Sequence, residues 1–200
     1  IEIMNKIHNT AIISKNAIIG DNVTIGPYSV IDDNVKIADD NYIYSSVYIS
    51  GKTDIDKSNK FFPFCSIGSI PQDLKYRGEN SKLIIGQNNV FREHCTANLG
   101  TEGDNMETII GSGSLFMVGV HIAHDCVIGD KVIFANQATL GGHVLVENNA
   151  VIGGLSAVHQ FCRIGTLSMI GGMSAVENDV IPYSLVLGNR AKITGVNIVG

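Results

Sequence analysis

The stretch IGDKVIFANQATLGGHVLVENNAVIGG, residues 128–154, decides the fold. Within it a large apolar residue returns at every sixth position, at Ile128, Phe134, Leu140, Val146 and Ile152. A period of six fits neither an amphipathic helix, with a period of about 3.6, nor a half-buried strand, with a period of about 2. It is typical of a β-helix, in which each six-residue unit gives a short strand and a corner, and stacked coils bury a continuous core.

The same period covers most of the chain. Counting by six gives only Ile or Phe from Ile7 to Ile67, and only large apolar residues from Ile110 to Val176. Gly, Asn and Asp follow several of these positions, as in the stretch 20–22, and they tolerate the left-handed backbone of a tight corner. We therefore expect an all-β solenoid over residues 1–182, with three hexads per coil, so that residues about 18 apart lie above one another.

Two interruptions of the repeat predict two projecting loops. Between about Ser69 and Lys82 the core positions become Asp73 and Glu79, and the phase slips by one residue over residues 98–107. We expect loops at about 69–82 and 98–107, and loops on a rigid scaffold often carry function. Past Val176 the pattern weakens, so we expect the solenoid to end near residue 182 and a short C-terminal segment to occupy residues 183–200.

Composition narrows the class of protein. With 44% hydrophobic and 16% charged residues, the 200-residue chain is expected to fold as one domain with a real core. A net charge of −5 disfavours a nucleic-acid-binding surface. No apolar run approaches the ~18 residues that a membrane span needs. The first ten residues, IEIMNKIHNT, lack the basic and apolar regions of a signal peptide, and we expect a cytoplasmic protein.

The cysteines fit the same scaffold. Cys65, Cys95, Cys126 and Cys162 all lie two residues before a core position, where small side chains recur. Cys126 and Cys162 are two predicted coils apart, roughly 9.6 Å at the strand spacing of a sheet, whereas a disulfide needs Cα atoms within about 7 Å. We expect all four to be small buried side chains without a disulfide, which fits a reducing compartment.

A polar patch on the second half of the solenoid is the candidate site. Stacking places His124 beneath Gly142 and Asp125 beneath His143 on the next coil. The expected members of the patch are His121, His124, Asp125, Gly142, His143, His159 and Gln160. A histidine can take a proton from a hydroxyl, an adjacent aspartate can orient it, and a glycine N–H can donate to a developing oxyanion. We interpret His124, Asp125 and Gly142 as these three parts of an acyl-transfer site.

A metal site is the competing interpretation. His121 and His124, joined by a histidine of another chain, would offer ligands for Zn²⁺, as in solenoids that resemble γ-type carbonic anhydrase. However, the core residue Ile122 lies between them, so the two imidazoles fall on different parts of the hexad. We expect no metal and no other cofactor. A surface without function would account for one exposed histidine, but less well for a whole stack of polar and glycine positions.

Six short segments add a family resemblance. They are PQDLKYRGE (71–79), HIAHDC (121–126), LGGHV (140–144), AVHQF (157–161), GNRA (188–191) and GVNI (195–198). With them, nearly the whole chain resembles the UDP-N-acetylglucosamine O-acyltransferases that begin lipid A synthesis in Gram-negative-type bacteria. The resemblance implies a left-handed parallel β-helix, an exception to the right-handed rule for crossovers, and a homotrimer with its active sites between subunits. It also implies transfer of an R-3-hydroxyacyl group from acyl carrier protein to the 3-hydroxyl of UDP-N-acetylglucosamine.

The resemblance carries residue roles onto matching positions. His124 would be the general base, Asp125 its orienting partner and Gly142 the oxyanion donor. In the first loop, Asp73 and Lys75 would contact the nucleotide sugar of an adjacent subunit's site. The further implied substrate contacts are His121, His143, Gln160 and Asn197, with His159 as an addition. Gly172 matches the position whose small size leaves room for the acyl tail and so sets its length.

The chain also departs from the family pattern. Asn98 and Leu99 stand where relatives often carry His-Arg, and Val199 stands where some carry an acid. The family usually continues into a helical domain, which we expect to be missing from this 200-residue chain. Acyl carrier proteins are acidic, so a local basic patch would have to receive them. The candidates for that patch are Lys75, Arg77, Lys82 and Arg92, with Arg163 and Arg190 further on.

Two other functions stay open at this point. The first is the N-acyltransferase of the same pathway, which acts on an amine of an already acylated sugar, but its relatives lack the QDLKYRGE loop. The second is a non-catalytic solenoid for binding or surface templating. That function needs regular outward-facing ladders such as rows of Thr, which this chain lacks, and it leaves the histidine patch unexplained.

Overall fold

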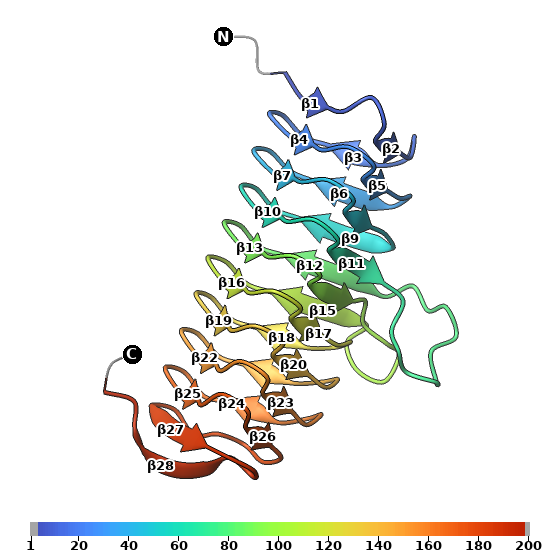
Figure 1. Ribbon diagram of the computed structural model, residues 1–200. Helices are drawn as coiled ribbons and strands as arrows, with labels where there is room; N and C mark the ends of the chain where they lie inside the picture. The colour runs from blue at the N-terminus through green and yellow to red at the C-terminus, as the bar shows by residue number, and fades with distance from the viewer. Residues whose placement is uncertain (1–3, 199–200) are drawn as a thin grey trace.

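The computed structural model describes residues 4–198, and every regular element in that range is a short β-strand. The strands follow one another around a slender solenoid whose coils stack along one axis (Figure 1). Within the described range, no helix is long and apolar enough to cross a membrane.

The strands of residues 4–198 form three sheets, named here A, B and C. Sheet A contains β1 (Lys6–Ile7), β4 (Thr24–Ile25), β7 (Tyr42–Ile43), β10 (Lys60–Phe61), β13 (Val90–Phe91), β16 (Leu115–Phe116), β19 (Ile133–Phe134), β22 (Val151–Ile152), β25 (Met169–Ile170), β27 (Ser184–Leu187) and β28 (Lys192–Val196). Sheet B contains β2 (Ile12–Ile13), β5 (Val30–Ile31), β8 (Tyr48–Ile49), β11 (Ser66–Ser69), β14 (Thr96–Asn98), β17 (His121–Ile122), β20 (Thr139–Leu140), β23 (Ala157–Val158) and β26 (Ala175–Val176). Sheet C contains β3 (Ile18–Ile19), β6 (Val35–Ile37), β9 (Lys52–Ile55), β12 (Lys82–Ile85), β15 (Glu107–Ile110), β18 (Val127–Ile128), β21 (Leu145–Val146) and β24 (Arg163–Ile164).

The register of the sheets confirms the predicted stacking. His121 pairs in parallel with Thr139, and Thr139 pairs with Ala157, so equivalent residues are 18 apart. Two coils are longer, because Asn59 and Asn89 are equivalent at a separation of 30 and Asn89 and Ser114 at 25. Those coils contain the two interruptions of the repeat.

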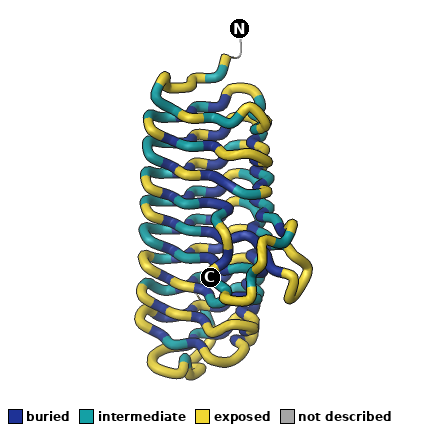
Figure 2. The backbone as a smooth tube through the Cα atoms, turned by 90° about the vertical axis from the view of Figure 1, so that its right-hand side faces the viewer, coloured by how far each residue is buried: buried dark blue, intermediate teal, exposed yellow. Residues whose placement is uncertain are grey.

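Both predicted loops project from the solenoid. The first follows β11 and the second follows β14, so both leave sheet B at the corner before sheet C. They extend to the same side of the stack in Figure 1, and Figure 2 shows them standing out from the regular coils as largely exposed segments. The insertions therefore build up one corner of the solenoid and leave the core in register.

The period-six positions form the core, with one correction at the N-terminal end. From Ile25 to Val176 the predicted core positions that continue the repeat are buried, and the four cysteines between them are buried and free. Ile7 was predicted to be buried but is 46% exposed, and Ile13 and Ile19 are only partly buried. These residues belong to the first coil, which has a neighbouring coil on one side only.

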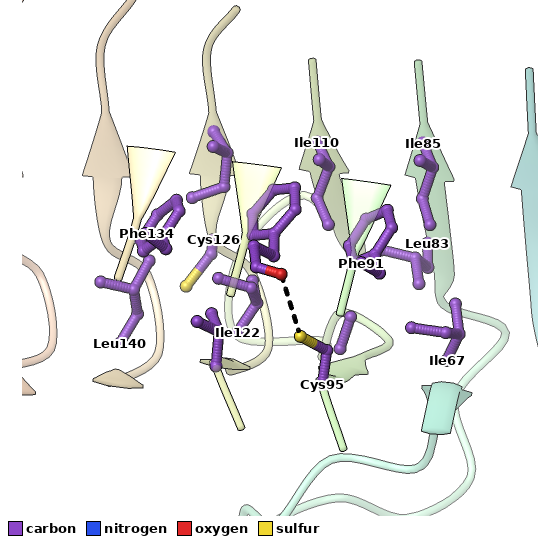
Figure 3. Close-up of a cluster of buried hydrophobic side chains, with 14 of the residues drawn as sticks. Ile67, Leu83, Ile85, Phe91, Cys95, Ile110, Ile122, Cys126, Phe134 and Leu140 are labelled. Carbon is purple, nitrogen blue, oxygen red and sulfur yellow. Dashed lines mark hydrogen bonds between the residues drawn. The ribbon is translucent and has the colours of Figure 1, made fainter. Parts of the chain in front are cut away.

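Phenylalanine rings fill the middle of the core. Phe61, Phe91, Phe116 and Phe134 stack from coil to coil with ring centroids 5.0, 4.4 and 5.2 Å apart. Stacked aromatic pairs contribute about 0.5–1.5 kcal/mol each beyond their buried area. Figure 3 shows Cys95 and Cys126 packed beside these rings. Burial raises the pKa of the Cys126 thiol to about 12, so this cysteine is a packing residue and not a nucleophile.

A ladder of buried asparagines holds the register across the two longer coils. The side-chain oxygens of Asn41, Asn59 and Asn89 each accept the backbone N–H of the equivalent residue on the next coil, Asn59, Asn89 and Ser114, at 2.9 Å. Buried polar groups that are all paired in this way specify one alignment of the strands. The coils therefore stay aligned although the loops lengthen them at the corner between sheets B and C.

The C-terminal segment is more regular than its sequence suggested. The solenoid was expected to end near Pro182, but β27 pairs in parallel with β25 and so adds one more strand to sheet A. The chain then reverses, and β28 pairs with β27 in the antiparallel direction. Sheet A thus continues beyond residue 182.

Candidate active site

A cavity of about 900 Å³ lies where the first loop faces the corners that follow β17, β20 and β23. Eight of the predicted site residues line it: Asp73, Lys75, His121, His124, Gly142, His143, His159 and Gln160. The loop and the stacked corners come from different parts of the sequence. The cavity therefore combines the two features that the sequence marked separately.

The corners place their side chains by a repeated backbone geometry. Asp125, His143 and Phe161 occupy equivalent corner positions with φ of 58°, 61° and 68°, in the left-handed region. The residue before each of them, which is His124, Gly142 or Gln160, lies at the cavity. A Cβ on Gly142 would lie only 2.4 Å from Cε1 of His124, so the imidazole fills the space that the missing side chain leaves.

His124 and Asp125 form a hydrogen-bonded pair. Nδ1 of His124 lies 2.8 Å from Oδ2 of Asp125, whose side chain is almost completely buried. Because a carboxylate can only accept, Nδ1 carries the proton and Nε2 keeps its lone pair. A lone pair on Nε2 is what a general base needs.

The carboxylate of Asp125 is held by a residue that the sequence did not indicate. Thr101, in the second loop, donates its N–H to Oδ1 at 2.9 Å and its hydroxyl to Oδ2 at 2.6 Å. The backbone N–H of Asp125 is bound by the hydroxyl of Thr108 at 2.8 Å. Asp125 thus accepts hydrogen bonds from Thr101 at its carboxylate and donates one to Thr108 from its backbone, and both threonines are buried.

Four neighbouring side chains fix the ring of His143. Its ring meets that of His124 edge-on at 5.1 Å and stacks on Phe161 at 4.5 Å. Its Nδ1 lies 3.2 Å from Oδ2 of Asp104 in the second loop, and its Nε2 lies 3.8 Å from Asp125. The ring is therefore a rigid wall of the cavity next to His124.

His121 lies on β17, three residues before His124, in surroundings that favour the neutral imidazole. Its Nδ1 is 2.7 Å from the hydroxyl of Thr96 on the neighbouring strand. Burial, followed by the charge of nearby His124, lowers the pKa of His121 below its ordinary value. A neutral imidazole at the cavity wall suits a substrate contact better than an ion pair.

The candidate metal ligands in the structure differ from those that the sequence suggested. Among residues 4–198, the group with suitable donor atoms is His124, Asp125 and His143, whose donors lie within 4.8 Å of one another. His121, which the sequence suggested as a ligand, is not part of it. Oδ1 and Oδ2 of Asp125 are already occupied as acceptors by Thr101 and His124. The observed bonds fit an orienting acid beside a base.

Comparison with known proteins gives the family. Residues 16–51 and 107–142 match the model described as Bacterial transferase hexapeptide (six repeats). The chain is 55% identical, over 98% of its own length and 76% of the relative's, to the acyl-[acyl-carrier-protein]–UDP-N-acetylglucosamine O-acyltransferase of Aliarcobacter butzleri, and 50% identical, with the same coverage, to that of a Sulfurovum species. The chain belongs to the UDP-N-acetylglucosamine O-acyltransferase family. Its structure matches that of LpxA from Acinetobacter baumannii with a TM-score of 0.95 and 47% identity, covering 96% of this chain and 74% of that one. The predicted left-handed parallel β-helix is thereby confirmed.

Within this O-acyltransferase fold, two predicted site residues lie elsewhere in the single chain. Gly172 occupies the corner between β25 and β26, at the opposite end of the sheet B strands from His124. Asn197 donates its backbone N–H to Tyr183 and its side-chain amide to Leu167, both at 2.8 Å, and does not line the cavity. Asp73 and Lys75 line the cavity of their own chain, although the resemblance suggested that they reach a neighbour's site. Val199 lies outside the described residues.

The departure at residues 98 and 99 has a structural explanation in this member of the acyltransferase family. Leu99 is part of the apolar core. Asn98 lines the cavity and donates its amide to the carbonyls of Ser69 and Ile70, at 3.3 and 3.2 Å, where the first loop begins. Asn98 thus ties the start of the first loop to the strand that leads into the second.

Sequence reasoning missed three residues of the site: Thr101, Asp104 and Phe161. Phe161 follows His143 by 18 residues, so the same count that aligned the histidines would have found it. Thr101 and Asp104 belong to the loop that breaks the period. No spacing rule connects them to the corners that they contact.

Proposed function

We propose that this chain transfers an R-3-hydroxyacyl group from acyl carrier protein to the 3-hydroxyl of UDP-N-acetylglucosamine, the first step of lipid A synthesis, with His124 as general base. The relatives that it matches over nearly its whole length carry the name of this reaction. The observation that carries the mechanism is the 2.8 Å bond between His124 Nδ1 and Asp125 at the cavity, which leaves Nε2 free to accept a proton.

The proposed steps follow from that geometry. Nε2 of His124 takes the proton of the sugar hydroxyl while the hydroxyl oxygen attacks the acyl thioester carbon and a C–O bond forms. The resulting oxyanion accepts a hydrogen bond from the N–H of Gly142, for which residues 4–198 provide no acceptor. When the C–S bond breaks, His124 returns its proton to the leaving thiolate. The buried charge of Asp125 stabilises the imidazolium between these steps.

A transfer assay tests the proposal. The chain is incubated with a panel of 3-hydroxyacyl carrier proteins of different chain length and one of three acceptors. The acceptors are UDP-N-acetylglucosamine, an analogue that carries a 3-amino group, and a 3-O-acylated glucosamine nucleotide with a free 2-amine. We expect an O-acylated nucleotide sugar for at least one acyl chain. Transfer only to the amine of an acylated sugar would favour the N-acyltransferase function, and no transfer to any sugar would contradict the proposal.

We infer a homotrimer with acyl carrier protein as the donor partner. Gly172 and Asn197 lie away from the His124 cavity of their own chain, so their implied roles require a neighbouring copy. A row of outward apolar side chains on sheet A is available for that contact: Val90, Leu115, Ile133, Val151 and Met169. Light scattering should give three chain masses, and a stable monomer at micromolar concentration would contradict the inference.

We also infer that the reaction takes place in the cytoplasm. The four free, buried cysteines are compatible with a reducing compartment, and a buried thiol needs no disulfide to contribute to packing. Cell fractionation tests the location. Recovery of the protein with the periplasmic fraction would contradict it.

We expect Gly172→Met to shift the preferred acyl donor toward shorter chains. A Cβ at this position would lie 3.3 Å from the carbonyl of Gly154 and in contact with little else, so a side chain would extend into open space instead of the core. It would shorten any groove that begins there. The measurement is kcat/KM across acyl chain lengths, with Gly172→Ala as an intermediate step. An unchanged profile for both variants would remove the role of Gly172 in setting chain length.

A further inference from the structure

The second loop reaches the catalytic pair through one buried side chain. Thr101 is 4% exposed, and its two donors contact both oxygens of Asp125, at 2.9 Å from N–H to Oδ1 and 2.6 Å from the hydroxyl to Oδ2. A hydroxyl at 2.6 Å from a carboxylate is a charge-assisted hydrogen bond, among the stronger kinds in proteins. The loop is thus bonded to the residue that orients the base.

Two imidazoles lie near the carboxylate oxygen that the Thr101 hydroxyl contacts. Oδ2 of Asp125 lies 2.8 Å from Nδ1 of His124 and 3.8 Å from Nε2 of His143, so both rings compete for the same oxygen. Rotation of the carboxylate toward His143 would lengthen the bond to His124. Because Thr101 contacts both oxygens at once, that rotation would break its two hydrogen bonds.

The loop is itself anchored, so it can act as a fixed support. The backbone N–H of Leu99 binds the carbonyl of Ser69 at 3.1 Å, and that of Gly100 binds Lys82 at 3.3 Å. A Cβ on Gly100 would lie 2.3 Å from the nitrogen of Glu107, so the two ends of the loop approach each other closely. A second contact of the same kind comes from Asp104, which binds Nδ1 of the competing ring, His143, at 3.2 Å.

We propose that Thr101 is a positioning residue for the acyl transfer: its hydroxyl holds the Asp125 carboxylate on the His124 side and thereby keeps Nε2 of His124 directed into the cavity. The inference rests on the proposed function, in which His124 is the base. The second loop then contributes to catalysis without touching substrate. Asp104 binds Nδ1 of His143 and so keeps that ring from replacing His124 at the Asp125 carboxylate.

The test compares Thr101→Val with Thr101→Ser. Valine keeps the shape and the backbone N–H but loses the hydroxyl, whereas serine keeps the hydroxyl and loses only a methyl group. We expect Thr101→Val to lower kcat about 10-fold or more, the usual effect of a lost hydrogen bond to a charged group, with KM for the nucleotide sugar unchanged. Thr101→Ser should stay within about 2-fold of the parent. Thr24→Val is the control for the same change of side chain: Thr24 is the partly exposed residue of β4 in sheet A and does not line the cavity.

The pH profile separates positioning from simple damage to the fold. The titratable groups that face the carboxylate are His124 and His143, with Asp104 and His121 next to those rings. A carboxylate that lacks the threonine hydroxyl can turn toward His143, and the imidazolium of His124 then loses part of the stabilisation that this negative charge gives it. The acid limb of kcat/KM should therefore move to lower pH in Thr101→Val but not in Thr101→Ser or Thr24→Val.

Two results would overturn the inference. One is a Thr101→Val enzyme with the parent's kcat and pH profile. The other is a Thr101→Ser enzyme as impaired as Thr101→Val, including the case in which both variants lose their fold, because then the methyl group and its packing matter instead of the hydroxyl. Failure of the proposed function gives a different result, namely a His124→Ala enzyme that remains active. An inactive His124→Ala enzyme together with a fully active Thr101→Val enzyme would remove only the role of Thr101.

Discussion

His124→Ala is expected to lower kcat for acyl transfer about 10²–10⁴-fold, the range that a positioned general base contributes. The variant loses the imidazole whose Nδ1 is bound by the buried Asp125 carboxylate, and Asp125 cannot replace it because its oxygens are occupied by Thr101. KM for the nucleotide sugar should change much less than kcat. Steady-state transfer assays with saturating acyl carrier protein measure both constants.

The control for this substitution is His94→Ala. His94 stacks on Phe64 with ring centroids 5.1 Å apart and does not line the cavity, so its loss should leave transfer unchanged. Thermal melts followed by circular dichroism should show that both variants keep the β-helix. Near-normal turnover of a folded His124→Ala enzyme would remove the base assignment and leave the family membership intact.

The solenoid could be predicted because its information is local and periodic. Every hexad needs one large and one small inward side chain, so the count from Ile25 to Val176 names the core residues directly. The same count aligned His124 with Gly142, because an equivalent residue 18 positions on must lie on the next coil. It failed at Ile7, since periodicity does not show that an end coil lacks a neighbour.

The parts of the site that could not be predicted come from segments where the period is broken. Thr101 lies 24 residues before Asp125, a separation that corresponds to no whole coil, and only the folded loop brings the two together. Gly172 and Asn197 illustrate the opposite case. The sequence grouped them with the site through the family resemblance, but in one chain they lie apart from the cavity. The cavity lies at the corners that follow the sheet B strands, whereas Gly172 precedes such a strand and Asn197 follows β28.

Gly142→Ala is expected to lower kcat by about 10²-fold, the cost of displacing a catalytic group by roughly 1 Å. The added Cβ would lie 2.4 Å from Cε1, 2.6 Å from Nε2 and 3.0 Å from Nδ1 of His124, so the ring has to move. It is bonded to Asp125 on one side and meets His143 edge-on at 5.1 Å, so movement breaks the 2.8 Å bond that orients it.

This substitution separates two roles of Gly142, because alanine keeps the backbone N–H proposed to bind the oxyanion. If Gly142 acts through the space it leaves for His124, Gly142→Ala will have almost no effect when His124 is already alanine, and the two effects will be strongly non-additive. If both substitutions lower the rate independently, the damage lies in the N–H geometry and not in the ring. A fully active Gly142→Ala enzyme would show that the imidazole of His124 can shift without loss of function. We do not expect this, because the bonds from Thr101 to Asp125 and from Asp125 to Nδ1 hold the ring in one position.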